Sequence, residues 1–172
     1  MDDPRVRTVW ERNLYGAASW NSGNFADPRA RELLGDSSLG SQARERASRV
    51  HIGDDLLLSR PAAMTVLSIE EAEGSWLIRT CRSSGDYYRL EDGAVSVETW
   101  PARVVETRLR TSEDGYEYLG SGGVEDCSAA GASIPQFVDP PQKSDLGSLE
   151  YDEIVGPDGK NIEVDPLWDG SA

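Results

Sequence analysis

Cysteine and histidine are scarce in this chain of 172 residues, which has two cysteines, Cys81 and Cys127, and one histidine, His51. A structural zinc site takes about four ligands, usually from these two residue types. The two cysteines also lie far apart, so there is no Cys-x-x-Cys redox motif. We therefore expect no metal and no other cofactor. Two interpretations of the cysteines stay open: a disulfide between them, which we favour, and two free buried thiols.

Positive charge is scarce as well. The chain has 17 lysines and arginines against 31 aspartates and glutamates, and its formal net charge is -14. A protein that binds nucleic acid needs basic patches to displace the counterions of the phosphate backbone. Anionic lipid surfaces likewise attract basic segments. We therefore expect neither nucleic acid nor an anionic lipid surface as a partner.

Long apolar runs are absent too. No stretch approaches the roughly 20 apolar residues that a transmembrane helix needs. Met1 is followed directly by Asp2, Asp3 and Pro4 and not by an apolar export segment. A structural disulfide, however, implies an oxidising compartment. We expect an exported protein, secreted or membrane-anchored, whose export segment is missing from this chain; a cytoplasmic location is the alternative.

Three helices are predicted in the first third of the chain, where apolar residues recur every three or four positions. Asp3-Pro4 and Asp27-Pro28 each place a capping side chain before a proline that suits a first helical turn. On the first helix, Arg12 is expected on the face exposed to water. The predicted helices are Asp3–Trp20, a short one from Asp27 to Gly35, and a third from Ser37 or Ser38 to about Gly53.

From about residue 56 the pattern changes to the two-residue alternation of strands. Val105, Thr107 and Leu109 alternate with charged residues, as in a sheet with one covered face, and the helices are its expected cover. Asp-Gly pairs favour tight hairpin turns between the strands. The predicted strands are 56–59, 62–71, 75–83, 87–90, 94–99, 103–111 and 116–127.

The chain changes character after residue 127. We expect an α+β domain at 1–127 and an acidic tail, rich in proline and glycine, at 128–172, which could hold a small hairpin at 149–164. An isolated hairpin is marginal in water. The tail must therefore dock on the body, dock on another chain or stay loose. Its low hydrophobicity favours looseness, although Trp168 argues for docking. Truncation after Ala129 is expected to leave the fold intact.

The order of these elements resembles a known superfamily. Val6 and Trp10 precede Leu14-Tyr15 on the first helix, and a short Asp-Pro helix, a third helix and a run of hairpins follow. This order is similar to the nuclear transport factor two-like (cystatin-like cone) superfamily, and more narrowly to small secreted or lipid-anchored members from actinobacteria. Those members have one cysteine that ends a mid-sheet strand, here Cys81, and one that closes the last strand, here Cys127.

The resemblance covers about residues 4–127. It implies a cone fold, in which a strongly curved antiparallel sheet wraps round the N-terminal helices and leaves a cavity at its open end. The chain departs from the pattern in lacking a lipid-attachment cysteine and in carrying the acidic tail.

Some members of that superfamily are isomerases or dehydratases that use buried acids in an apolar cone. The nearest candidates for catalytic residues here are Tyr15, Asp36 and His51. No acidic residue completes the set on an apolar strand face, and Gly-x-Ser-x-Gly and phosphate-loop motifs are missing. Catalysis is therefore the less favoured function.

Aromatic residues are the candidate binding residues, namely Trp20, Tyr87, Tyr88 and Trp100, because aromatic rings near strand ends often form interfaces. Packing of the core by the same rings is the open alternative. We expect an exported, non-catalytic domain that binds a protein or a small apolar ligand. The two alternatives are an isomerase- or dehydratase-like enzyme and a protein whose tail mediates assembly. A homodimer through the sheet or the tail is a further expectation.

Overall fold

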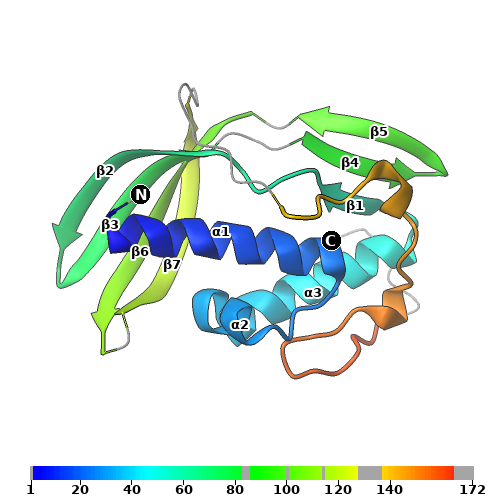
Figure 1. The fold of residues 1–172 in the computed structure, drawn as a ribbon, viewed down its shortest axis with the longest axis horizontal. Helices are drawn as coiled ribbons and strands as arrows, with labels where there is room; N and C mark the ends of the chain where they lie inside the picture. The colour runs from blue at the N-terminus through cyan, green and yellow to red at the C-terminus, as the bar shows by residue number, and fades with distance from the viewer. Residues whose placement is uncertain (1, 83–85, 100, 114, 128–136, 165–172) are drawn as a thin grey trace.

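The computed structural model describes residues 2–82, 86–99, 101–113, 115–127 and 137–164, and confirms the predicted α+β class (Figure 1). Within these residues, three α-helices come first, seven strands follow, and two short 3-10 helices, Lys143–Asp145 and Tyr151–Glu153, come last. The α-helices are α1 (Pro4–Ser22), α2 (Pro28–Leu34) and α3 (Asp36–His51). The strands are β1 (Asp55–Leu58), β2 (Met64–Ala72), β3 (Ser75–Arg82), β4 (Asp86–Glu91), β5 (Ala94–Thr99), β6 (Arg103–Ser112) and β7 (Gly115–Asp126).

The strands form two antiparallel sheets in place of the single curved sheet that was expected. One sheet has the order β2-β3-β6-β7 and the other has the order β1-β4-β5. The chain passes between the sheets after β1, after β3 and after β5. β1 pairs with β4 and not with β2, which follows it in the chain. Among the described residues, no strand of one sheet is hydrogen-bonded to a strand of the other. Figure 1 shows them at opposite ends of α1.

The hairpin turns follow the local sequence closely. Glu73 and Gly74 join β2 to β3, and Asp92 and Gly93 join β4 to β5. All four residues have positive φ angles, of 53°, 73°, 50° and 77° in chain order. Two consecutive residues in this region form the type of turn that matches the twist of the flanking strands. The Asp-Gly prediction for the β4–β5 turn is confirmed.

Helix α1 is shared by two hydrophobic clusters. The side chain of Asp3 caps the helix by accepting a hydrogen bond from the Arg5 backbone N–H, as predicted. Near this end the helix packs on the four-stranded sheet, through a cluster that contains Val6, Val9, Met64, Ile78 and Leu109. Its other end adjoins a second cluster, which contains Phe25, Leu33, Leu34, Leu39, Ala43 and Ile154. No described helix is both long and apolar enough to cross a membrane.

A disulfide between Cys81 and Cys127 crosslinks the four-stranded sheet, with an S–S distance of 2.10 Å. Cys81 lies near the end of β3 and Cys127 directly follows β7. Strand β6 lies between β3 and β7 in the sheet. The disulfide therefore joins the two strands that flank β6.

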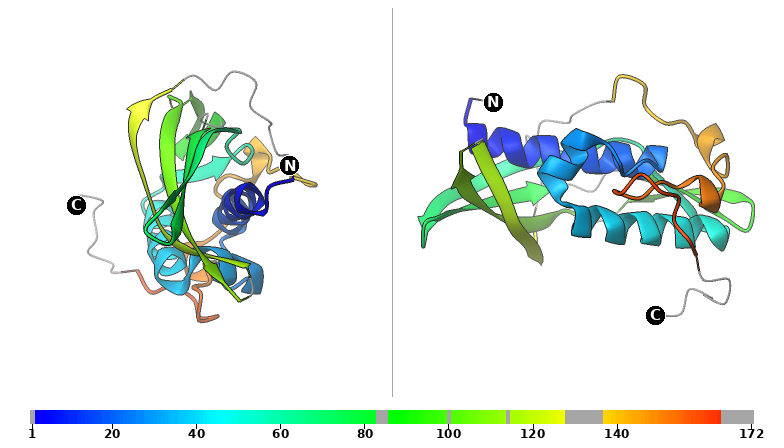
Figure 2. Two further views of the ribbon diagram at one scale, coloured as in Figure 1. Left: turned by 90° about the vertical axis from the view of Figure 1, so that its left-hand side faces the viewer. Right: turned by 90° about the horizontal axis from the view of Figure 1, so that it is seen from below.

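Within the described part of the tail, residues 149–164 pack on the helical body. Ile154 is 0% exposed and belongs to the same cluster as Phe25. The Phe25 N–H donates to the Val155 carbonyl and the Val155 N–H donates to the Gly23 carbonyl, both at 2.9 Å. In the view from below, this part of the chain passes close to α3 (Figure 2). The 128–136 segment, where the domain boundary was placed, and Trp168 lie outside the described residues.

Gly23 makes this docking sterically feasible. Its φ angle is +67°, in the left-handed region that favours glycine at the end of a helix. A Cβ atom at this position would lie 2.6 Å from the Leu149 side chain and 3.3 Å from that of Ile154. Within the expected hairpin, the structure has a short helical turn at Tyr151–Glu153 and a single antiparallel bridge between Val155 and Asn161.

Candidate functional site

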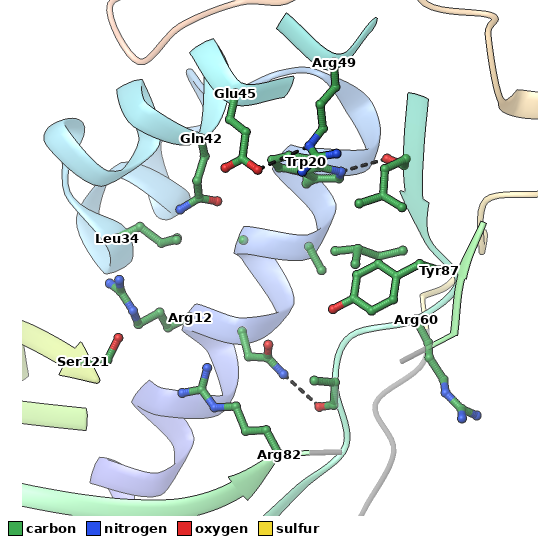
Figure 3. Close-up of a pocket in the computed structure, with 16 residues that line it drawn as sticks. Arg12, Trp20, Leu34, Gln42, Glu45, Arg49, Arg60, Arg82, Tyr87 and Ser121 are labelled. Carbon is green, nitrogen blue, oxygen red and sulfur yellow. Dashed lines mark hydrogen bonds and ion pairs between the residues drawn. The ribbon is translucent and has the colours of Figure 1, made fainter. Parts of the chain in front are cut away.

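A pocket of about 350 Å³ lies along α1, with walls from both sheets and from α2 and α3 (Figure 3). The chain passes from one sheet to the other beside it after β1, where Arg60 and Ala62 line the pocket. The pocket is lined by Arg12, Asn13, Gly16, Ala17, Trp20, Leu34, Gln42, Glu45, Arg49, Leu56, Leu58, Arg60, Ala62, Arg82, Tyr87 and Ser121. Since these residues come from segments far apart in the sequence, the pocket exists only in the folded chain.

Two arginines reach into one end of the pocket. Arg12 comes from the middle of α1 and Arg82 is the last residue of β3, and both extend toward the region of Ser121 (Figure 3). Arg12 donates from Nη1 to the Leu33 carbonyl at 2.5 Å, and its guanidinium lies 3.2 Å from the centre of the Tyr118 ring. The stacking on Tyr118 is a cation–π contact that orients the guanidinium.

Arg82 is held more weakly. Its Nε and Nη2 atoms donate to the hydroxyls of Thr80 and Thr107, both at 3.4 Å. Burial, together with the positive charge of Arg12, lowers the pKa of Arg82 to about 10. Burial also lowers the pKa of Arg12 from its ordinary value. Arg82 nevertheless stays protonated at neutral pH, because that pH is well below the pKa of its side chain.

Neither Arg12 nor Arg82 has an ion pair with a carboxylate within the described ranges. Arg49, on the opposite wall, differs in this respect. Its Nη1 lies 2.6 Å from Asp54 and its Nε lies 3.3 Å from Glu45. Positive charge is therefore compensated at one end of the pocket and left without a carboxylate partner at the other.

Aromatic and aliphatic side chains line the rest of the pocket. Trp20 donates from its indole nitrogen to the Leu56 carbonyl at 2.8 Å, which fixes the ring between α1 and β1. The Tyr87 ring also faces the pocket (Figure 3). Burial raises the pKa of the Tyr87 phenol, so this group is neutral at physiological pH. Leu56 and Leu58 of β1 supply aliphatic surface beside the two rings.

The structure places the candidate catalytic residues in three separate environments, and the pocket lining contains none of them. Tyr15 packs against the helical core cluster. Asp36 forms an exposed ion pair with Arg31 at 2.9 Å, and the hydrogen bonds from this arginine lower the pKa of the Asp36 carboxyl. His51 lies edge-on to Tyr151 of the tail, with 4.9 Å between ring centres. The structure does not bring these three groups together.

Two of the four candidate binding residues line the pocket. Trp20 and Tyr87 lie together in the pocket. Tyr88, the next residue on β4, has Lys143 of the tail 5.4 Å above its ring and is not part of the pocket lining. Trp100 lies outside the described residues.

The sequence patterns missed Arg12 and Arg82. Arg12 was assigned to the exposed face of the first helix, but it is only partly exposed and lines the pocket. Arg82 follows Cys81 at the end of a strand, where a charged residue ordinarily faces water. The one available signal was the position of Arg82 next to a cysteine that was expected to be buried.

No family model, curated protein or solved structure matches this chain. The superfamily resemblance therefore stays a prediction from the order of elements. Within the described ranges, no cluster of three or more histidine, cysteine, aspartate and glutamate residues could hold a metal ion. The function must be argued from the pocket and its lining.

Proposed function

We propose that this chain is an exported, non-catalytic domain that binds a small organic ligand in the pocket along α1. The observation that carries the proposal is the pocket itself, with Trp20 and Tyr87 on its walls. Small-molecule sites usually span about 300–1,000 Å³ and combine apolar walls with a few placed polar groups. The volume of about 350 Å³ and the mixture of aromatic, aliphatic and arginine side chains fit this description.

Binding has more support than catalysis. An isomerase-like site would need facing acids or an acid and a phenol in one apolar cavity. Asp36 and Arg31 neutralise each other at the surface, and His51 packs on the tail. Glu45, the one acidic residue in the pocket lining, is paired with Arg49. Assembly through the tail also has less support, because Leu149 and Ile154 pack on the body of their own chain.

Export and the cone-like arrangement are part of the same proposal. The disulfide supports export, because such bonds persist in oxidising compartments. The two sheets at opposite ends of α1 are compatible with a sheet of the cone superfamily that has separated into two parts. The cavity that the superfamily resemblance implies would then correspond to this pocket.

A neutral fluorescent probe, N-phenyl-1-naphthylamine, tests the proposed function. Its emission rises in apolar sites, so a titration of the purified chain is expected to show saturable binding. Replacing Ala62 on the pocket wall by phenylalanine adds a ring where the probe would lie. We expect Ala62→Phe to weaken probe binding by about tenfold or more, which corresponds to about 1.4 kcal/mol.

Ala94→Phe is the matched control, because Ala94 is exposed at the start of β5 and is not part of the pocket lining. This variant should bind the probe as the unmodified chain does. Equal binding by Ala62→Phe and the unmodified chain, with both proteins folded by circular dichroism, would contradict the proposal.

A further inference from the structure

We propose that the ligand is a small amphipathic organic acid whose carboxylate lies between Arg12 and Arg82 and whose apolar body lies against Trp20 and Tyr87. This inference rests on the proposed binding function and names the chemical class of the ligand. It differs from the small apolar ligand expected from the sequence, because the arginine end of the pocket adds a site for negative charge.

The uncompensated charge is the first argument. Partly buried cations without a carboxylate partner raise the free energy of the folded state, and two neighbouring cations also repel each other. The chain has 31 acidic residues, yet none of those described forms an ion pair with Arg12 or Arg82. An anion bound between the two guanidinium groups would remove both costs.

The free donors are the second argument. A guanidinium carries five N–H donors in a rigid plane and binds a carboxylate through two parallel hydrogen bonds. Within the described residues, Arg12 donates to the Leu33 carbonyl and also interacts with the Tyr118 side chain, and Arg82 makes two long hydrogen bonds, to Thr80 and Thr107. Both side chains therefore keep donors for a carboxylate at the end of the pocket near Ser121.

The rest of the pocket lining indicates which kind of group the ligand carries besides its carboxylate. Trp20, Tyr87, Leu56 and Leu58 offer aromatic and aliphatic surface at the other end. Burial of an apolar group there removes its surface from water and so favours binding. A volume of about 350 Å³ is in the range of small-molecule sites. The net charge of -14 also repels polyanions, whereas a single negative charge is attracted by the local pair of arginines.

A matched pair of probes tests the inference without any mutation. 4-Phenylbutyrate and 4-phenylbutanol have the same apolar body and differ in the charged end, and acetate has the charged end alone. Isothermal titration of the full, disulfide-bonded chain is expected to show at least tenfold tighter binding of 4-phenylbutyrate than of either other probe. Affinity for the acid should fall as salt is added, while affinity for the alcohol should not.

Arg82→Gln tests the site itself. This change removes the charge and leaves a polar side chain near the threonine hydroxyls. We expect it to weaken 4-phenylbutyrate binding at least tenfold and to leave 4-phenylbutanol binding unchanged. Arg7→Gln is the control, because Arg7 is exposed on α1 and the change in net charge is the same. Arg82→Lys keeps the charge but loses the planar fork, and should give an intermediate affinity.

Each outcome separates this inference from the proposed function. Equal affinity for the acid and the alcohol would overturn the inference while the pocket remains a binding site. Binding of N-phenyl-1-naphthylamine without binding of 4-phenylbutyrate would overturn it as well. An equal loss of acid binding in Arg7→Gln and Arg82→Gln would show that overall charge, not this site, attracts the acid. Failure of all the probes would overturn the proposed function itself.

Discussion

At the scale of single residues, the ion pair between Arg46 and Asp55 lies at the centre of the helical half of the molecule. Their side chains are 1% and 3% exposed. The Arg46 Nε donates to the Trp20 carbonyl at 3.2 Å, and Asp55 accepts from the Gly147 N–H at 2.8 Å. One pair of charges thus connects α1, α3, β1 and the tail.

We expect Asp55→Ala to lower the free energy of unfolding by about 3–5 kcal/mol, because it leaves the Arg46 charge buried without a partner. Chemical denaturation measures this difference. The matched control is Asp36→Ala, which removes an exposed pair with Arg31 and should lower the free energy of unfolding far less. An equal loss in the two variants would contradict a special role for the buried pair.

At the scale of elements, the tail behaves as part of the helical layer. It joins the α1–α2 connection through two backbone hydrogen bonds and places Ile154 in the same cluster as Leu39 of α3. The apolar residues of the tail that contact this cluster are Leu149, Ile154, Ile162 and Val164. They are few in an acidic segment of low hydrophobicity, which is why the composition favoured a loose tail.

The docked tail reverses the expectation that truncation after Ala129 is harmless. We expect a chain that ends at residue 136 to be markedly less stable, since it lacks the tail residues of the core cluster. In the full chain, Ile154→Ala should lower the free energy of unfolding by about 2–5 kcal/mol.

Val138→Ala is the control for this prediction, because Val138 lies in the same tail and is 98% exposed. Its effect should stay within about 0.5 kcal/mol. Thermal unfolding followed by circular dichroism compares the three proteins. An unchanged unfolding temperature in both the truncated chain and Ile154→Ala would show that the tail does not dock in solution.

At the scale of the whole molecule, the disulfide stabilises the sheet that carries Arg82. The bond closes a loop across a sequence separation of 46 residues, which contains β4, β5, β6 and β7. Arg82 directly follows Cys81, so the crosslink lies beside the arginine end of the pocket. Crosslinking a loop of this length reduces the conformational entropy of the unfolded chain.

We expect the double variant Cys81→Ala, Cys127→Ala to lose about 4 kcal/mol of unfolding free energy and to unfold roughly 10 °C lower. Reductant should have a similar effect on the unmodified chain and none on the double variant. Peptide mapping under non-reducing conditions should recover Cys81 joined to Cys127. Two alkylatable thiols in protein purified under oxidising conditions would contradict both the crosslink and the argument for export.

The sequence by itself determined the three N-terminal helices, the pairing of successive strands in the β2–β3, β4–β5 and β6–β7 hairpins, and the turn between β4 and β5. Asp3 and Asp27 cap the helices that they precede, and Asp92-Gly93 forms the turn that its residue types favour. Each of these features depends on residues within a few positions of one another, so local preferences are sufficient to predict them. The alternation in β6 likewise predicted the burial of Thr107 and Leu109, but not that of Val104, which is buried in place of Val105 because the register shifts between these two residues.

Only the tertiary structure decided the division into two sheets, the docking of the tail and the composition of the pocket. Each depends on contacts between residues that are distant in the sequence, which periodicity and composition do not encode. Arg12 and Arg82 belong to a helix and a strand, and each alone is an ordinary charged residue. They become a candidate anion site because the fold brings them into one pocket end where no described carboxylate neutralises them.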